Sequence, residues 1–99
     1  MSNYDQFVRD HWGVHPKTGG DNLTPDLFIM ATGLTGEAGE VMEHLKKFIR
    51  DGRLDKEALK LELGDVLFYL TRTAQWAGFS LEEIAQGNID KLEARYGKR

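Results

Sequence analysis

The 99-residue chain contains no cysteine, which excludes disulfide bonds, thiolate zinc sites and cysteine nucleophiles. It also lacks any apolar run close to the ~18 residues that a membrane-spanning helix needs. Residues 1–5 do not resemble a signal peptide. A net charge of −3 and a pI near 5.5 leave no basic excess, so neither nucleic acid nor a membrane is an expected partner. The length fits one domain, residues 1–99, and we expect it to be cytoplasmic.

Apolar residues recur at helical spacing in four segments of the chain. The first segment is short and stops at Gly13. The second is long, with Thr24 as its expected N-cap and Pro25 as its first helical residue, and it ends at Gly52. Residues 13–22 are rich in turn formers, which indicates a loop that is either a connector or a flap over a ligand. The apolar positions of the first segment are Tyr4, Phe7, Val8 and Trp12.

The second half of the chain supplies two further helical segments. Asp55 is placed to cap the third helix, which ends at Gly78. Ser80 and Glu83 have the spacing of a capping box that opens the fourth, which ends at Gly97. The residues expected to face inward from the fourth helix are Ile84, Ile89 and Leu92. The pattern predicts an all-α fold, a helical bundle of about four helices with a long central helical hairpin. The apolar share of 40% is slightly low, which favours a core completed by oligomerisation.

Three glycines interrupt the long second helix at three-residue spacing: Gly33, Gly36 and Gly39. Each costs roughly 1 kcal/mol relative to alanine in a helix. A stripe without side chains indicates either that another backbone packs closely there or that the helix bends.

Two pairs of acids, Glu37 with Glu40 and Glu62 with Asp65, lie three residues apart. Each pair therefore projects from one face of its helix. A single such pair is usually a solvated surface, but both pairs here flank apolar stripes and lie among small residues. Clustered carboxylates repel one another unless a hard cation lies among them. Ligands that offer only oxygen favour Mg²⁺, or alternatively Mn²⁺, over zinc.

The turn of the hairpin predicts which acids face each other. A hairpin centred on residues 52–53 places Glu40 opposite Asp65 and Glu43 opposite Glu62. The length of the loop allows a slip of one turn in either direction. The acids are therefore expected to converge on one shared patch.

Polar and aromatic residues elsewhere in the chain suit a polyphosphate ligand. Asn88, Lys91 and Arg95 fall on one line of the fourth helix, where cations beside a metal site would bind phosphate oxygens. The alternative for them is a solvated helix face. Tyr69 and Trp12 are candidates for stacking on a base, although core packing is the usual role of such residues.

Two motifs carry a resemblance to a known family. The acidic pairs form E-x-x-E, 21 residues and E-x-x-D, and the C-terminal segment reads Asn88-x-x-Lys91-x-x-x-Arg95-Tyr96. Together they resemble the MazG-like all-α nucleoside triphosphate pyrophosphohydrolases, relatives of dimeric dUTPase and phosphoribosyl-ATP pyrophosphohydrolase. The resemblance runs from about Leu27 to Tyr96, and the first 24 residues match no motif of the family.

The resemblance implies a Mg²⁺-dependent hydrolase that splits nucleoside triphosphates, NTP or dNTP, into monophosphate and pyrophosphate and so controls the nucleotide pool. It implies that Glu37, Glu40, Glu62 and Asp65 bind the metal. Glu37 and Glu40 are also expected to be catalytic, one of them orienting or deprotonating the attacking water.

The same resemblance implies the roles of the remaining residues. Asn88, Lys91 and Arg95 would hold phosphates, with Lys91 also catalytic, while Tyr69 would contact the sugar or base. Trp12 lies outside the resemblance and stays a candidate for stacking on the base. A homodimer or homotetramer is expected, in which a site borrows residues from a neighbouring chain. Two alternatives stay open: a phosphoribosyl-ATP pyrophosphohydrolase, or a non-catalytic helical module that dimerises.

Overall fold

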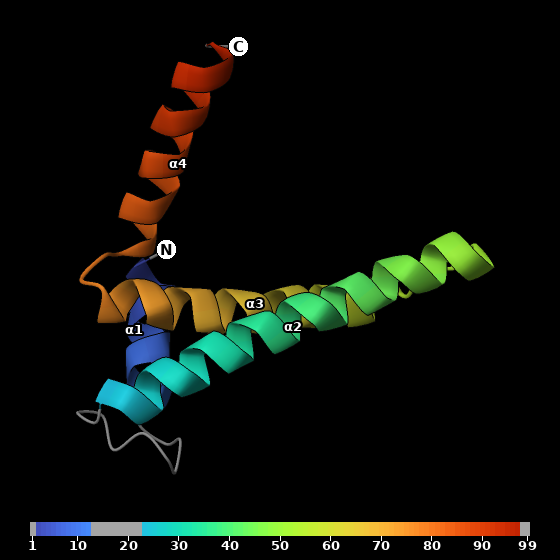
Figure 1. Cartoon of the computed structure of the whole chain (residues 1–99), viewed down its shortest axis with the longest axis horizontal. Coiled ribbons are helices and arrows are strands. Elements are labelled where there is room, and N and C mark those ends of the chain that lie inside the picture. Colours follow the sequence, from blue (N-terminus) through green and yellow to red (C-terminus); the bar gives the residue numbers. More distant parts are fainter. Residues whose placement is uncertain (1, 13–22, 98–99) are drawn as a thin grey trace.

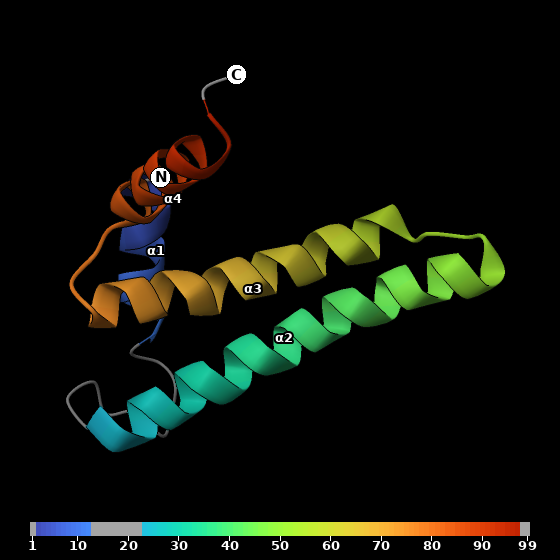
Figure 2. The same ribbon diagram turned by 45° about the horizontal axis from the view of Figure 1, so that its top comes forward.

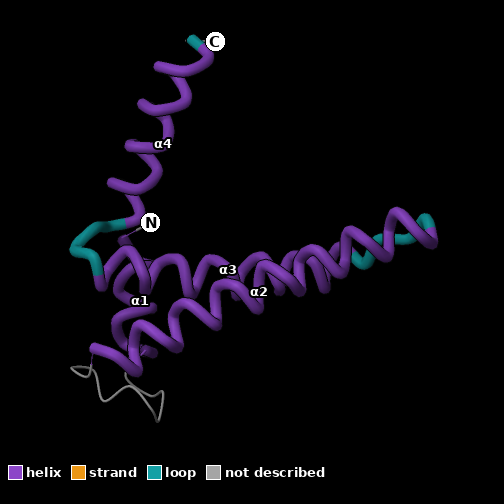
Figure 3. Tube along the Cα trace, viewed as in Figure 1, coloured by secondary structure: helices purple, strands orange, loops and turns teal. Residues whose placement is uncertain are grey.

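The computed structural model describes residues 2–12 and 23–97, and within these ranges every regular element is a helix (Figure 1, Figure 3). The helices are α1 (Ser2–Trp12), α2 (Leu23–Asp51), α3 (Lys56–Trp76) and α4 (Leu81–Tyr96). The predicted all-α fold class is therefore confirmed. The predicted loop at 13–22 lies outside the described residues. Within the described helices, no segment is long and apolar enough to cross a membrane.

Helices α2 and α3 form the predicted central hairpin and run antiparallel side by side (Figure 1). Gly52, with a φ of 75°, follows the last residue of α2, in a conformation that glycine adopts at little cost. Asp55 caps α3 as predicted, because its side chain accepts a hydrogen bond of 3.0 Å from the amide of Ala58.

The start of α2 differs from the prediction. The helix begins at Leu23, so Thr24 lies within the first turn and is not the cap. Pro25 does not fix the start to one residue, because the first four amides of a helix have no partner within the helix and a missing N–H is tolerated at any of them.

The loop at the tip of the hairpin sets the register of the two helices. After Gly52 the chain runs back along the hairpin in extended form before α3 begins (Figure 2), and Asp55 has extended dihedral angles. Extended residues advance ~3.3 Å each, whereas helical residues advance ~1.5 Å. Each α3 residue therefore lies opposite an earlier residue of α2 than a count along two helices predicts.

The remaining two helices meet at the far end of the hairpin from this loop. There α1 packs across α3, and α4 starts beside both and projects away from the hairpin (Figure 1). The capping box of α4 is confirmed, because the Ser80 hydroxyl accepts from the Glu83 amide and the Glu83 carboxylate accepts from the Ser80 amide.

The buried core of the described chain is small. One apolar residue from each helix is buried: Val8, Met30, Ala74 and Leu81. The prediction that α4 turns Ile84, Ile89 and Leu92 inward is wrong for Ile89 and Leu92 in the single chain, where their exposed fractions are 49% and 39%. Ile84 is 39% exposed but lines an apolar hollow with Leu70 and Ala74 of α3. Beyond this residue α4 projects away from the hairpin (Figure 1).

Candidate metal centre

Three carboxylates converge where α2 and α3 pack together. Glu37 on α2 and Glu62 and Asp65 on α3 each offer one oxygen, and these oxygens lie within 4.8 Å of one another. The pair on α3 shares a helix face because its members are three residues apart. Packing of the hairpin then brings Glu37 to that face. We call these three residues the acidic cluster.

The register of the acidic cluster corrects the predicted pairing. Glu37 takes the place expected for Glu40, which is exposed and lies outside the cluster. Glu43, expected opposite Glu62, is instead exposed on α2 with its carboxylate 3.8 Å from the Lys46 ammonium. The shift of about one turn follows from the extended residues at the tip of the hairpin. Three of the four acids of the motif are thus brought together.

The acidic cluster raises the pKa of Glu37 from 4.5 to about 7. Burial of the carboxyl contributes most, followed by its hydrogen bond to Glu62 and then by the charges of Asp65, Glu62 and Glu40. A hydrogen bond between two carboxyl groups requires a proton on one of them. At neutral pH a proton on Glu37 thus partly relieves the repulsion that a cation would relieve fully.

One buried oxygen of the acidic cluster lacks a hydrogen-bond partner among the described residues. Oε2 of Glu62 is buried and accepts no hydrogen bond in the described structure, although a buried carboxylate oxygen is costly to leave unsatisfied. Oxygens bound to one Mg²⁺ lie at most ~4.2 Å apart, given bonds of ~2.1 Å. Small side-chain rotations would bring oxygens now within 4.8 Å into that range. The acidic cluster therefore fits a hard divalent cation.

Tyr69 lies one turn beyond Asp65 on α3, and its ring packs directly over Gly33 of α2. A Cβ at Gly33 would collide with three atoms of this ring. A Cβ at Gly36 or Gly39 would meet no atom of the described residues within 4 Å. At its first position the glycine stripe therefore accommodates an aromatic ring, and no backbone of the described residues packs against Gly36 or Gly39. Gly33 thereby determines where the Tyr69 ring lies relative to the acidic cluster.

The sequence reading missed Tyr4 as a neighbour of the acidic cluster and assigned it only an apolar position in the first helix. Its side chain is half-buried, and its pKa is raised, first by burial and second by the charge of Asp65. The phenol therefore lies within electrostatic range of the acidic cluster. No sequence signal identified this, because it depends on how α1 docks across α3.

The predicted phosphate ligands lie on a different part of the molecule. Asn88, Lys91 and Arg95 are exposed on α4. Among the described helices, α4 lies against α1 and α3 and not against α2. A single chain thus does not bring these residues onto the Glu37 side of the hairpin. Trp12 ends α1, and its side chain lies outside the described residues.

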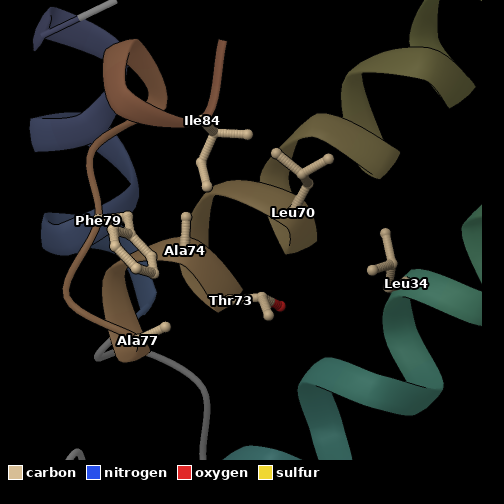
Figure 4. A pocket seen from close by; sticks show the side chains of 7 residues that line it. All are labelled: Leu34, Leu70, Thr73, Ala74, Ala77, Phe79 and Ile84. Atoms are coloured by element: carbon tan, nitrogen blue, oxygen red, sulfur yellow. The ribbon is translucent and has the colours of Figure 1, made fainter. Parts of the chain in front are cut away.

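An apolar hollow of about 230 Å³ lies between the hairpin and the start of α4 (Figure 4). Leu34 closes one side, Leu70 and Thr73 of α3 form the floor, and Phe79 and Ile84 form the other side. The Thr73 hydroxyl donates to the Tyr69 carbonyl at 2.8 Å. The walls therefore favour an apolar occupant.

The fold and the site define an all-α protein with an acidic centre on a helical hairpin. A family model for the MazG nucleotide pyrophosphohydrolase domain matches residues 28–99, and the chain belongs to this family. Members of the family are typically metal-dependent, and family membership implies pyrophosphohydrolase chemistry on a nucleotide substrate. Helix α1 precedes the matched residues.

A similar protein is the gene 37 protein of Mycobacterium phage L5. It is 30% identical over 95 residues, which cover 91% of this chain and 83% of that protein. No solved structure matches the chain.

Proposed function

We propose that this chain hydrolyses nucleoside triphosphates, NTP or dNTP, to nucleoside monophosphate and pyrophosphate with Mg²⁺ bound, and that it thereby controls the nucleotide pool. The observation that carries the proposal is the convergence of Glu37, Glu62 and Asp65 from two helices of a MazG domain. Mn²⁺ is the alternative ion, because it accepts the same oxygen ligands.

The acidic cluster would hold the ion. The partnerless Oε2 of Glu62 offers a ready oxygen, Asp65 offers a second, and Glu37 a third once it releases its proton. A bound Mg²⁺ supplies charge neutralisation at the phosphate oxygens and lowers the pKa of an attacking water. Release of the proton from Glu37 couples ion binding to pH, because a protonated carboxyl is a poor ligand.

Glu40 is the residue we propose for handling the proton of the attacking water. It is exposed, lies one turn after Glu37 and is not part of the acidic cluster. An acid that is close to the ion without being enclosed by the other carboxylates can accept a proton from water. We retain Glu40 as a further ligand of a second ion, should the site take one.

The residues of α4 would bind the phosphates. Lys91 and Arg95 carry the positive charge that a triphosphate needs beyond the ion, and Asn88 adds an amide donor. Lys91 would also act in catalysis by neutralising charge that develops on the reacting phosphate. These residues act beside an acidic cluster when α4 comes from another copy in a homodimer or homotetramer.

The base and sugar would meet the aromatic residues. The Tyr69 ring lies one turn from Asp65 and is held over Gly33, where it can contact a nucleoside whose phosphates reach the ion. Trp12 is the second aromatic residue in this proposal. The whole chain, residues 1–99, would work as one domain.

Product analysis tests the proposal. The protein is incubated with each nucleoside and deoxynucleoside triphosphate, with Mg²⁺ or with EDTA, and the products are separated by ion-exchange chromatography. We expect monophosphate and pyrophosphate in equal amounts, and only with the metal. Diphosphate with orthophosphate, or no turnover of any nucleotide, would overturn the proposal.

A further inference from the structure

Asp5 is a buried acid outside the acidic cluster. Only 3% of it is exposed, in a helix whose neighbouring acid Asp10 is exposed. Burial of a carboxylate is costly unless donors satisfy it. A buried acid in α1 indicates that this helix is packed against the rest of the chain. Helix α1 precedes the residues that the family model matches.

The partners of Asp5 come from two helices that are far from it in sequence. The Gln75 side-chain amide donates to the Asp5 carbonyl at 2.8 Å and to its carboxylate at 3.4 Å. The backbone amide of Leu81 donates to the other carboxylate oxygen at 3.4 Å. Asp5 thus connects α1 to the end of α3 and to the first residue of α4.

The hydrogen bond from Leu81 places the Asp5 carboxylate at the N-terminus of α4, where a negative charge stabilises a helix. The first four amides of a helix have no partner within the helix, and the helix dipole favours negative charge at this end. The Ser80 side chain accepts from the Glu83 amide, and Asp5 accepts from the Leu81 amide. The first turn of α4 is therefore held partly by its own cap and partly by α1.

Little else in the described chain holds α4 in place. Leu81 is buried, and no residue of α4 after it is. The linker before it turns at Gly78, which has a φ of 90°. Arg95 lies ~21 Å along the helix from Leu81 at 1.5 Å per residue, so a rotation of ~10° at the first turn moves it by ~4 Å.

We infer that Asp5 is a positioning residue, whose hydrogen bonds to Gln75 and Leu81 fix the direction in which α4 projects from the hairpin. The expected effect of Asp5 on nucleotide binding rests on the proposed function, because it assumes that Lys91 and Arg95 bind phosphate. The expected effect of Asp5 on the direction of α4 does not depend on that function.

Distance measurement between spin labels tests the structural consequence. The absence of native cysteine allows clean labelling of the exposed residues Lys47 on α2 and Ala94 on α4 after Lys47→Cys and Ala94→Cys substitution. Dilution with unlabelled protein suppresses distances between copies. In the parent protein we expect one narrow distance distribution, and in Asp5→Asn a distribution at least twice as broad.

Two further variants make this result decisive. Gln75→Met removes the amide that bonds to Asp5 while keeping the side-chain length, and it should broaden the distribution as well. Asp10→Asn removes the same charge from an exposed position of the same helix and should leave the distribution unchanged. An unchanged narrow distribution in Gln75→Met and in folded Asp5→Asn would overturn the inference. Should Asp5→Asn fail to fold, Gln75→Met alone decides.

Kinetics test the consequence for catalysis. In Asp5→Asn we expect KM for the nucleotide to rise by about 10-fold with little change in kcat, since 1.4 kcal/mol corresponds to a factor of ten. Affinity for Mn²⁺ should stay within twofold of the parent, because the acidic cluster does not involve α4. An unchanged KM would refute the kinetic part. A parent protein that turns over no nucleotide would refute the proposed function and leave the spin-label result to decide the positioning role.

Discussion

The hairpin and α4 carry site residues with the same helical spacing, yet only the hairpin assembles them. On the hairpin, two antiparallel helices bring Glu37, Glu62 and Asp65 together. On α4, Lys91 and Arg95 are exposed on a helix that projects away from the hairpin, with only α1 and α3 against it among the described helices (Figure 1). Spacing along one helix defines a face, whereas convergence needs a second element packed against it.

The two regions also differ in what they need to become active. In the acidic cluster the pKa of Glu37 is raised first by burial, then by its hydrogen bond to Glu62 and by the neighbouring negative charges, and a cation would offset that charge. The cations of α4 are solvated and separate, and they need an anion and a neighbouring surface. A metal-bound triphosphate would supply both the cation for the acidic cluster and the anion for Lys91 and Arg95, which is the physical argument for the proposed function.

The largest effect is expected when the assembled region loses one ligand. In Asp65→Asn the pyrophosphate release rate should fall by at least ~100-fold, because even residues that only support a metal ligand cost 10–100-fold when mutated. The fold should persist, since Asp65 is exposed and its removal lowers repulsion. The measurement is pyrophosphate release at saturating Mg²⁺, with circular dichroism to follow folding.

The matched control for this experiment is Glu57→Gln. It removes one exposed acid from the first turn of the same helix, outside the acidic cluster, and should keep activity within twofold. Equal activity of Asp65→Asn and this control would remove Asp65 from the site.

The second largest effect is expected on α4. Arg95→Ala should raise KM for the nucleotide by ~10–100-fold, because a hydrogen bond to a charged group contributes about 1.5–3 kcal/mol. Mn²⁺ affinity should not change, because the ion site lies on the other region. Initial rates as a function of nucleotide and a Mn²⁺ titration separate the two effects. A loss of Mn²⁺ affinity equal to the loss in KM would show that the regions are not separate.

Mixing the two impaired variants, assayed at a nucleotide concentration near the parent KM, sharpens the comparison further. If α4 acts on the acidic cluster of another copy, a mixed oligomer of Asp65→Asn and Arg95→Ala contains one site with both defects and one with neither. After random subunit exchange in an equal mixture of dimers, half of the dimers are mixed and each has one intact site, so activity should return to about a quarter of the parent level. No recovery in a mixture shown to exchange subunits would mean that α4 serves its own chain.

Helices could be predicted from the sequence because their signals are local. Asp55 and the pair Ser80 and Glu83 cap their helices through bonds that span three residues, and the predicted ends at Gly52 and Gly97 were confirmed. Each of these features depends only on neighbouring residues. The same holds for the i, i+3 acids of α3.

Features that depend on how helices dock could not be predicted in the same way. The pairing of Glu37 with Asp65 depends on extended loop residues that a count along two helices ignores. The proximity of Tyr4 to Asp65 and the bonds of Asp5 to Leu81 depend on the docking of α1. Contacts across more than sixty residues of the chain left no pattern in the sequence.

A smaller effect is expected at Gly33. Comparing alanine substitutions at Gly33 and Gly36 separates the effect of side-chain packing from the effect of helix propensity. Gly33→Ala gains about 1 kcal/mol of propensity but forces the Tyr69 ring to move, and overpacking costs about 1–3 kcal/mol. Gly36→Ala gains the same propensity with no neighbour within 4 Å. Gly33→Ala should thus be less stable than Gly36→Ala by about 1–3 kcal/mol. Urea unfolding of both variants measures this difference, and equal stabilities would show that Tyr69 does not pack on Gly33.

The smallest effect is expected from titration of Glu37 in the metal-free protein. Its pKa rises from 4.5 to about 7 on folding, so between these pH values the folded state holds a proton that the unfolded state has released. Stability should therefore fall as pH rises through this window and level off above about pH 7. In EDTA we expect Tm to drop by ~3 °C between pH 5 and pH 8, a size consistent with about 1 kcal/mol or less in a chain of this length.

Two controls connect this drop to the acidic cluster. Glu37→Gln should flatten the dependence of Tm on pH and stabilise the metal-free protein at pH 8, whereas Glu57→Gln should not. Saturating Mg²⁺ at pH 8 should raise Tm in the parent, because ligand binding to the folded state adds stability, and should raise it less in Glu37→Gln. A Tm that rises from pH 5 to pH 8 in EDTA, with the same slope in Glu37→Gln, would contradict the hydrogen bond and the repulsion that define the acidic cluster. The acidic residues of the hairpin would then titrate without the mutual repulsion that distinguishes the hairpin from α4.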